Sequence, residues 1–417
     1  ARAVRAFDRA TQAPVTLAAL NEAGGMPRPR ALLPLADWHR ERADAMSLFA
    51  WIAGPPVPPA TLAYAGPNGV TTRADLQHGA LKAAAMLLHF QDDKPAHGAP
   101  DRRFLDQHRV MAILPKGETL LALALGALAS GSLFSVAADD LSHDVMAARI
   151  RAFQPDLIVA GASAWSGVLA QDAAFNTVAA LIVDDAGDAA ALADLTESFD
   201  PATALPAIQA TDPGLVVFTS GSDGAQKGVT LANAVHGGGS GLDALLNLTG
   251  GDRVAYLTRW DAVGLTDILA CIRGGAGVVL PDALALSTPA RLIDWMNDTS
   301  TTVLSMPASI WRPISASAAW RDGAPAALRA GVLWGERIDW RVIGALRETA
   351  PDMDAFATFG ASEATYIGFG RLSGSGDRAR YGDDGASPGG DPVPGTTVRI
   401  IDGDAAADSD EIGQIEV

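Results

Sequence analysis

The residues with the clearest chemical potential form one stretch at 215–229, which reads LVVFTSGSDGAQKGV. An apolar run leads into hydroxyl residues, glycines and one lysine, Lys227. Glycine lets the backbone approach a ligand closely, while backbone N–H groups, hydroxyl groups and a lysine attract oxyanions. The pattern therefore predicts a loop that holds phosphate groups. It is not a Walker loop, because Gly228 follows the lysine where Ser or Thr would be required.

This loop resembles the signature T-S-G-[ST]-T-G-x-P-K-G-V of the adenylate-forming, or AMP-binding, superfamily. The chain looks most like the N-terminal portion of a non-ribosomal peptide synthetase-type adenylation domain. Two positions differ, with Asp223 where Thr is usual and Gln226 where Pro is usual. An acid that faces pyrophosphate would weaken ATP binding unless it points away or helps to hold Mg²⁺. The resemblance implies ATP contacts, with catalytic roles for the first and last residues of this set: Thr219, Ser220, Gly221, Ser222, Gly224 and Lys227.

Further segments follow in the family's order, and the likeness covers about residues 60–417. FGASE at 359–363 is similar to Y-G-x-[TS]-E, which implies that Phe359 stacks on adenine, that the Ser362 hydroxyl touches the α-phosphate and that Gly360 is also among the ATP-binding residues. Glu363 would then bind Mg²⁺ and be catalytic. A turn beside the adenine is implied for Gly335, Glu336 and Arg337. The hydroxyl loop, the lysine and a Glu-bound Mg²⁺ would together stabilise negative charge as a carboxylate attacks the α-phosphate.

The segment after Trp260 indicates which acid is activated. Asp261 resembles the Asp that binds the α-ammonium of the substrate in peptide-synthetase adenylation domains, so we expect a small cationic, amino-acid-like acid. Trp334 would shorten the pocket. Carried over position by position, the pocket lining is Asp261, Ala262, Leu265, Ser305, Val332, Trp334, Thr358, Tyr366 and Ile367.

Three other interpretations stay open for these residues. An acid beside Trp and Tyr faces can hold a methylated ammonium or sulfonium group by cation–π attraction. Alternatively, Asp261 caps the helix expected at 265–272 and the chain is an acyl- or aryl-CoA ligase. As a remote alternative, residues 360–364 nearly match the G-x-S-x-G motif of serine hydrolases. Ala364 breaks that motif, and the last histidine of the chain, His236, precedes Ser362.

Short apolar runs alternate with helical patterns from about residue 70. Such alternation is typical of an α/β fold with parallel strands, so we expect two packed, largely parallel sheets with flanking helices. Expected helices lie at 74–90, 145–153, 265–272 and 340–349. Expected strands lie at 110–114, 157–160, 180–183, 215–218, 277–280, 302–305, 330–334 and 354–359.

Glycine and proline clusters indicate the domain organisation. They predict a lead segment and linker at 1–60, an α/β core at 61–372 with an internal boundary near 205, and a β-rich segment at 373–417. Within the last segment, 398–402 and 412–417 look like strands. We expect them to begin a small β-barrel subdomain, with a C-terminal subdomain missing from this sequence.

Composition limits the partners. With 31 Lys and Arg against 48 Asp and Glu, the net charge of −17 argues against nucleic acids and anionic membranes as partners. The uncharged stretch 119–138 is broken by Gly and Ser, so it predicts a buried helix and strand rather than a membrane span. A single cysteine, Cys271, suits a cytoplasmic protein. The implied cofactors are ATP and Mg²⁺, and the implied acceptor is a carrier-protein phosphopantetheine thiol or CoA.

Overall fold

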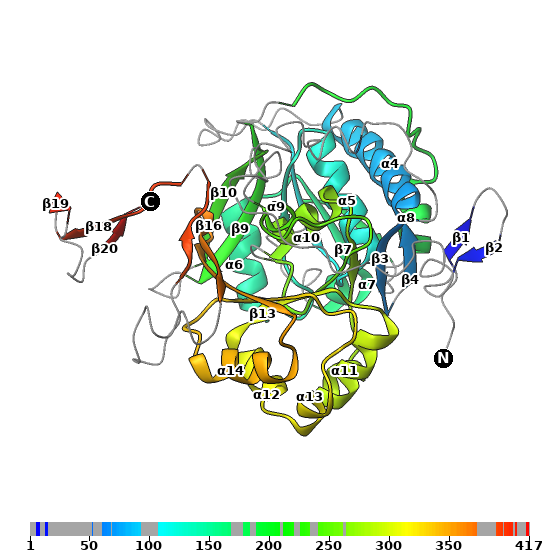
Figure 1. Ribbon diagram of the computed structural model, residues 1–417. Helices are drawn as coiled ribbons and strands as arrows, with labels where there is room; N and C mark the ends of the chain where they lie inside the picture. Colours follow the sequence, from blue (N-terminus) through cyan, green and yellow to red (C-terminus); the bar gives the residue numbers. More distant parts are fainter. Residues whose placement is uncertain are drawn as a thin grey trace.

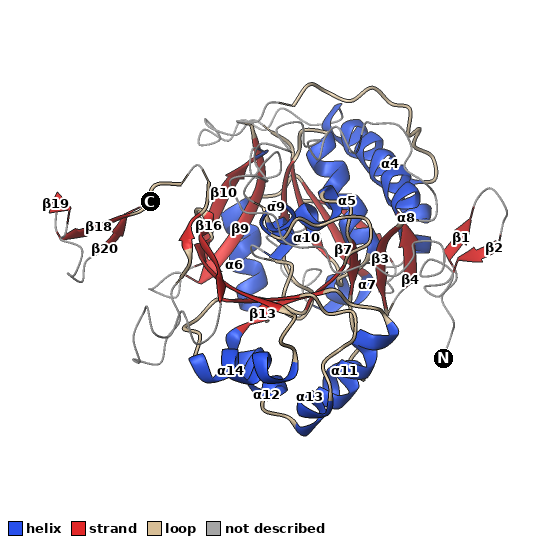
Figure 2. Ribbon diagram, in the orientation of Figure 1, coloured by secondary structure: helices blue, strands red, loops and turns tan. Residues whose placement is uncertain are grey.

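The computed structural model describes the chain in segments, with helices on both sides of its two large sheets (Figures 1 and 2). The expected α/β fold with two largely parallel sheets is confirmed. The described residues are 6–8, 13–15, 52, 61–67, 69–92, 107–167, 178–183, 189–208, 212–220, 226–233, 241–261, 264–372, 389–394, 396–402, 405–406 and 414–416.

A six-stranded sheet has the order β10-β9-β6-β5-β7-β8, and only β10 is antiparallel to its neighbour. Its central strands are apolar on both faces because helices cover both faces. Val110 packs in the cluster that contains α5, whereas Met111 packs in the cluster that contains α6. The strands are β5 (Arg109–Ile113), β6 (Leu133–Val136), β7 (Leu157–Gly161), β8 (Ala179–Val183), β9 (Pro213–Ser220) and β10 (Gln226–Ala232).

A nine-stranded sheet has the order β17-β16-β15-β14-β13-β11-β12-β3-β4. Its six central strands, from β15 to β3, are parallel, and its outer strands are antiparallel. The strands are β3 (Leu62–Gly66), β4 (Gly69–Thr72), β11 (Arg253–Tyr256), β12 (Gly277–Val279), β13 (Val303–Pro307), β14 (Ala330–Trp334), β15 (Asp354–Ala361), β16 (Thr365–Leu372) and β17 (Asp391–Pro392).

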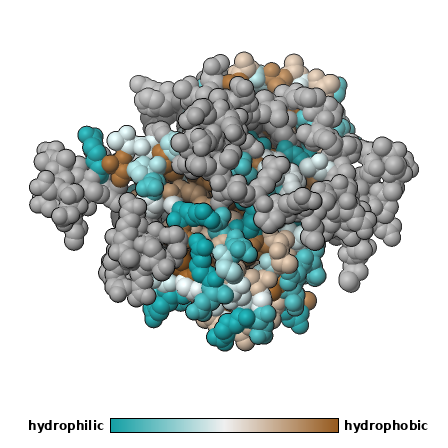
Figure 3. Space-filling view, viewed as in Figure 1, coloured by the Kyte–Doolittle hydropathy of each residue, from teal (hydrophilic) through white to brown (hydrophobic). Residues whose placement is uncertain are grey.

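The helices complete the layers. Helices α11 to α14 pack in one apolar cluster against one face of the nine-stranded sheet, while α4, α5 and α10 belong to a larger cluster that includes residues of both sheets. Over α11–α14, hydrophilic residues cover much of the described surface (Figure 3). The bounds are α4 (Arg73–Asp92), α5 (Glu118–Ala129), α6 (His143–Phe153), α7 (Ala162–Gly167), α8 (Ala189–Thr196), α9 (Leu242–Leu245), α10 (Gly264–Arg273), α11 (Pro289–Asp298), α12 (Ala308–Ser315), α13 (Ala318–Asp322) and α14 (Trp340–Thr349).

Each strand and helix expected in the α/β core overlaps an observed element of the same type. The uncharged stretch 119–138 forms most of α5 and all of β6, as expected. In the part of the chain that the structure describes, no helix combines the length and the apolar character that a membrane crossing requires. The six-stranded sheet continues past residue 205 to residue 232, and the domain boundaries stay a prediction.

Small antiparallel sheets lie near both ends of the chain. β1 (Ala6–Asp8) pairs with β2 (Ala13–Val15), and β18 (Arg399–Asp402) pairs with β19 (Ala405–Ala406) and β20 (Gln414–Glu416). The strands expected at 398–402 and 412–417 overlap β18 and β20. The expected barrel subdomain stays a prediction.

Candidate functional site

The neck of the predicted phosphate loop is a pair of antiparallel strands, β9 and β10. Thr219 lies directly opposite Lys227, and Ser220 lies opposite Gln226. The pairing brings together the hydroxyl and the lysine that the sequence separates by eight positions. The loop itself, with Gly221, Ser222, Asp223 and Gly224, lies outside the described residues.

A tight hairpin of β15 and β16 carries the FGASE segment. Its pairing shifts register between Phe359 and Gly360, and a Cβ built on Gly360 would lie 1.9 Å from the carbonyl oxygen of Thr365. Only glycine fits there. Phe359 is 40% exposed, an unusual exposure for a large apolar side chain.

Glu363 and Ser362 lie in the turn of this hairpin, and Glu363 is exposed. Mg²⁺ is commonly held by one or two carboxylates together with substrate phosphates, and an exposed carboxylate fits that mode. Among the described residues, no group of three His, Cys, Asp or Glu side chains could hold a metal ion by itself. Because Ser362 follows a strand but leads into another strand, the hydrolase alternative lacks the strand–turn–helix context of a nucleophile elbow.

The predicted turn at Gly335 follows β14. Gly335 has a φ of +82°, which favours glycine, and Glu336 and Arg337 are exposed. The Glu336 Oε1 accepts a hydrogen bond of 2.6 Å from the backbone N–H of Ser309 at the start of α12. Hydrogen bonds from Ser309 hold the pKa of Glu336 below its ordinary value. The turn is therefore fixed to the neighbouring helix.

The predicted acid pocket is assembled from neighbouring strands of the nine-stranded sheet. The Trp334 Nε1 donates a 3.1 Å hydrogen bond to the Ser305 Oγ, and its ring stacks on Tyr256 at 5.8 Å and 23°. Both contacts fix the indole. Val332 and Leu265 are buried in the same apolar cluster as Tyr256, and Trp334 and Tyr366 pack against that cluster. Thr358 and Ile367 lie on β15 and β16, while Ala262 lies outside the described residues.

A buried acid that the sequence analysis did not identify adjoins this pocket. The Tyr366 hydroxyl donates a 2.8 Å hydrogen bond to the Asp267 Oδ1 on α10. Burial raises the pKa of Asp267 to about 7, although hydrogen bonds from Tyr366 and Tyr256 act in the opposite direction. An acid directly before the apolar run that begins at Ile268 was the available sequence signal for this site.

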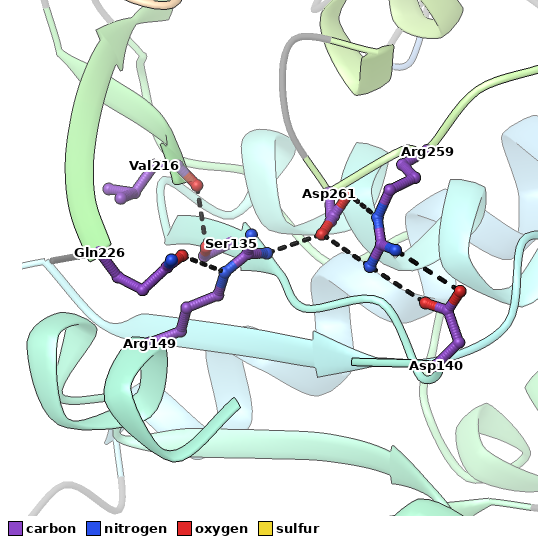
Figure 4. A network of polar contacts seen from close by, with 7 residues as sticks. All are labelled: Ser135, Asp140, Arg149, Val216, Gln226, Arg259 and Asp261. Carbon is purple, nitrogen blue, oxygen red and sulfur yellow. Dashed lines mark hydrogen bonds and ion pairs between the residues drawn. The ribbon is translucent and has the colours of Figure 1, made fainter. Parts of the chain in front are cut away.

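Asp261 is only 4% exposed and lies between two arginines (Figure 4). Its Oδ2 is 2.7 Å from the Arg149 Nη1, and its Oδ1 is 3.1 Å from the Arg259 Nε. Burial alone would raise the pKa of Asp261, but hydrogen bonds from Arg259 and Arg149 outweigh burial and lower it. The carboxylate is therefore ionised and already balanced by guanidinium groups. That Asp261 binds the ammonium group of the substrate stays a prediction. Such a group would have to compete with Arg149 and Arg259 for the carboxylate.

A cavity of about 80 Å³ adjoins Asp261. Charged groups of both signs line it, including Lys116, Asp139, Asp140 and Arg259. Burial lowers the pKa of Lys116 and raises the pKa of Asp139. A polar group that enters this space therefore meets partners of either sign.

Comparison with known proteins places this geometry in a family. The model of the AMP-binding enzyme family matches residues 60–417. No curated protein sequence matches significantly.

Solved structures share the fold. VinN superposes with a TM-score of 0.69 at 20% identity, covering 91% of this chain and 86% of VinN, and it has also been solved with L-aspartate. ATP-bound MatB from Rhodopseudomonas palustris superposes with a TM-score of 0.70 at 18% identity, covering 89% of this chain and 69% of MatB. A benzoate CoA ligase from Burkholderia xenovorans LB400 superposes with a TM-score of 0.68 at 16% identity, covering 92% of this chain and 71% of the ligase. At identities this low, the likeness shows a shared fold.

Proposed function

Because the chain belongs to the AMP-binding family of adenylate-forming enzymes, we propose that it activates a small, amino-acid-like carboxylic acid as its acyl-adenylate. ATP would supply the AMP group: a carboxylate oxygen bonds to the α-phosphorus, and the bond from that phosphorus to pyrophosphate breaks. The acceptor of the activated acyl group would be a carrier-protein phosphopantetheine thiol or CoA. A cytoplasmic setting belongs to the same proposal.

The observation that carries this proposal is the pairing of Thr219 with Lys227 at the loop neck. A lysine and a hydroxyl on facing strands would both be able to contact the oxygens of a triphosphate. A lysine alone would offer fewer contacts. Lys227 would stabilise the charge that develops as pyrophosphate departs. The exposed ring of Phe359 would stack on adenine, and Glu363 would hold Mg²⁺ against the phosphates.

The acid would lie between Asp261 and Trp334. The fixed indole limits the depth of the pocket, which favours a short side chain or a compact methylated head. VinN was solved with L-aspartate, and that supports an amino-acid-like substrate. The onium alternative uses the same surfaces, since the faces of Trp334 and Tyr366 would hold a methylated cation by cation–π attraction.

A second candidate function is supported by the ion pairs of Asp261. If Arg149 and Arg259 keep the carboxylate engaged, Asp261 serves the structure and the acid is neutral, as in an acyl- or aryl-CoA ligase. The shared fold with a benzoate CoA ligase is compatible with this candidate.

Hydroxamate release separates the two functions. Alanine, glycine betaine, propionate and benzoate are offered with ATP, Mg²⁺ and hydroxylamine to the wild type and to Asp261→Asn. We expect a cationic acid to be preferred, and Asp261→Asn to lower its turnover about tenfold or more, because a charge-assisted contact is lost. Equal turnover of propionate or benzoate, unchanged in Asp261→Asn, would assign the chain to the acyl or aryl ligase branch.

A further inference from the structure

Arg149 on α6 contacts three segments that the proposed reaction uses, and Figure 4 shows its contacts with two of them, at Gln226 and Asp261. Its Nε donates to the Gln226 Oε1 at 3.0 Å, and its Nη1 donates to the Asp261 Oδ2 at 2.7 Å. Its guanidinium carbon lies 5.4 Å from the centre of the Phe218 ring. Arg149 is only 8% exposed, so the charge is removed from water and depends on these partners.

The contacts with Gln226 and Phe218 lie on the two strands that form the neck of the phosphate loop. Gln226 directly precedes Lys227 on β10, and Phe218 directly precedes Thr219 on β9. Nearby, the Ser135 Oγ donates a 2.8 Å hydrogen bond to the carbonyl oxygen of Val216, which ties β6 to β9. Arg149 therefore contacts the residues that directly precede Lys227 and Thr219, the two residues proposed to bind phosphate.

The contact with Gln226 lies where the family signature has proline. Proline fixes its own φ, so a loop that contains it is stiff without side-chain partners. Glutamine supplies no such restraint, but its amide oxygen accepts the hydrogen bond from Arg149. The guanidinium thus provides from outside the strand a restraint that proline would provide from within it.

The third contact reaches the other sheet. Asp261 follows β11 of the nine-stranded sheet, whereas β9 and β10 belong to the six-stranded sheet. One guanidinium therefore joins the segment that carries Asp261 to the two strands that flank the predicted phosphate loop. Stability alone is a weak reason to bury such a pair, since buried ion pairs are often replaced by apolar residues without loss.

We propose that Arg149 is a positioning residue of the adenylation reaction, which holds the phosphate-loop neck through Gln226 and couples it to the acid-binding segment through Asp261. The inference rests on the proposed function, because it assigns Arg149 a task only if ATP binds at this loop. Arg149 need not touch ATP. It acts through Gln226, Phe218 and Asp261.

Binding of Mg·ATP to the full chain, measured by calorimetry without any acid, tests this role. We expect Arg149→Gln and Gln226→Ala each to weaken binding about fivefold, the size of one lost hydrogen bond. The double variant should bind no more weakly than Arg149→Gln, because both changes remove one interaction. Asp261→Asn should also weaken binding, about twofold or more, although it lies in the acid segment, because Arg149 loses its counter-ion.

A matched control is the buried pair of Arg329 and Asp252, which has the same 2.7 Å contact at the start of β14, away from the loop. Arg329→Gln should lower the melting temperature and leave the affinity for Mg·ATP unchanged. Arg149→Lys, which keeps the charge but not the two-armed geometry, covers the case in which Arg149→Gln does not fold. It should bind Mg·ATP as weakly as Gln226→Ala.

Three results would overturn the inference while leaving the proposed function intact. These are wild-type affinity in Arg149→Gln or Arg149→Lys, additive losses in the double variant, and an equal loss of affinity in Arg329→Gln. If the wild type does not bind Mg·ATP at all, the proposed function fails and Arg149 has no positioning role.

Discussion

Two buried acids near the predicted acid pocket differ in their surroundings. Asp261 faces Arg149 and Arg259, which keep it ionised. Asp267 receives hydrogen bonds from the phenol groups of Tyr366 and Tyr256, and its pKa is raised to about 7 by burial. Asp261 thus has a lowered pKa and two arginine partners, whereas Asp267 changes its charge near neutral pH.

Asp267 makes the stability of the protein depend on pH. Its folded pKa of about 7 lies above the ordinary value of 3.8, so the folded state retains a proton that the unfolded state loses. The contribution of this group to stability is complete below pH 3.8 and is lost as the pH rises through 7. The free energy of unfolding should fall by at most about 1.4 kcal/mol per pH unit on this account.

Urea unfolding of the wild type and Asp267→Asn at pH 5 and pH 8 measures this effect. The asparagine variant carries no titrating group there, so its stability relative to the wild type should improve at pH 8. Asp339→Asn is the control, because Arg341 lowers the pKa of Asp339 to about 2, outside this interval. A difference between wild type and Asp267→Asn that does not change with pH would refute the assignment.

At the scale of elements, the β15–β16 hairpin presents Phe359 and Glu363. Gly360 allows this because any Cβ would collide with the backbone of Thr365. We expect Gly360→Ala to destabilise the protein by about 1–3 kcal/mol, the usual effect of overpacking, and to displace the hairpin turn. Denaturant unfolding measures the loss.

The control for this change is Gly344→Ala on α14. No atom lies within 4 Å of a Cβ built there, and alanine favours a helix, so this variant should gain about 0.5–1 kcal/mol. Gly360→Ala as stable as Gly344→Ala would show that the close approach in the hairpin is not a constraint.

The sequence predicts the interior strands well because strands buried on both faces are continuous apolar runs, as in β5 and β14. It did not predict β3, β11 or β16. β11 has only four residues, β3 pairs with the distant β12, and β16 contains two glycines that break its pattern. Such strands are defined by partners rather than by local composition.

Site residues that lie on one segment can be proposed from local sequence, whereas contacts between distant segments cannot. Arg149 and Asp261 are 112 positions apart, so no local spacing joins them. One signal was present: Arg149 lies three residues after Met146 and four before Phe153, which places it on the buried face of a helix. The partner that neutralises it required the structure.

For the whole molecule, the proposed reaction draws on both sheets. The six-stranded sheet supplies Thr219 and Lys227, while the nine-stranded sheet supplies Trp334, Phe359 and Glu363. One apolar cluster includes residues from both sheets and fixes them relative to each other. The chemistry therefore depends on the packing of the two sheets as much as on either loop.

Exchange of labelled pyrophosphate into ATP tests the central claim most directly, because it requires reversible formation of an acyl-adenylate. The account predicts exchange that depends on an added acid and on Mg²⁺, and that falls about 100-fold or more in Lys227→Ala, where a charge that stabilises the transition state is lost. Glu363→Gln should also reduce exchange without a matching loss of stability. The exposed Arg341→Gln serves as the control and should exchange like the wild type. Exchange absent with every class of acid, or equal in the wild type and Lys227→Ala, would contradict the account.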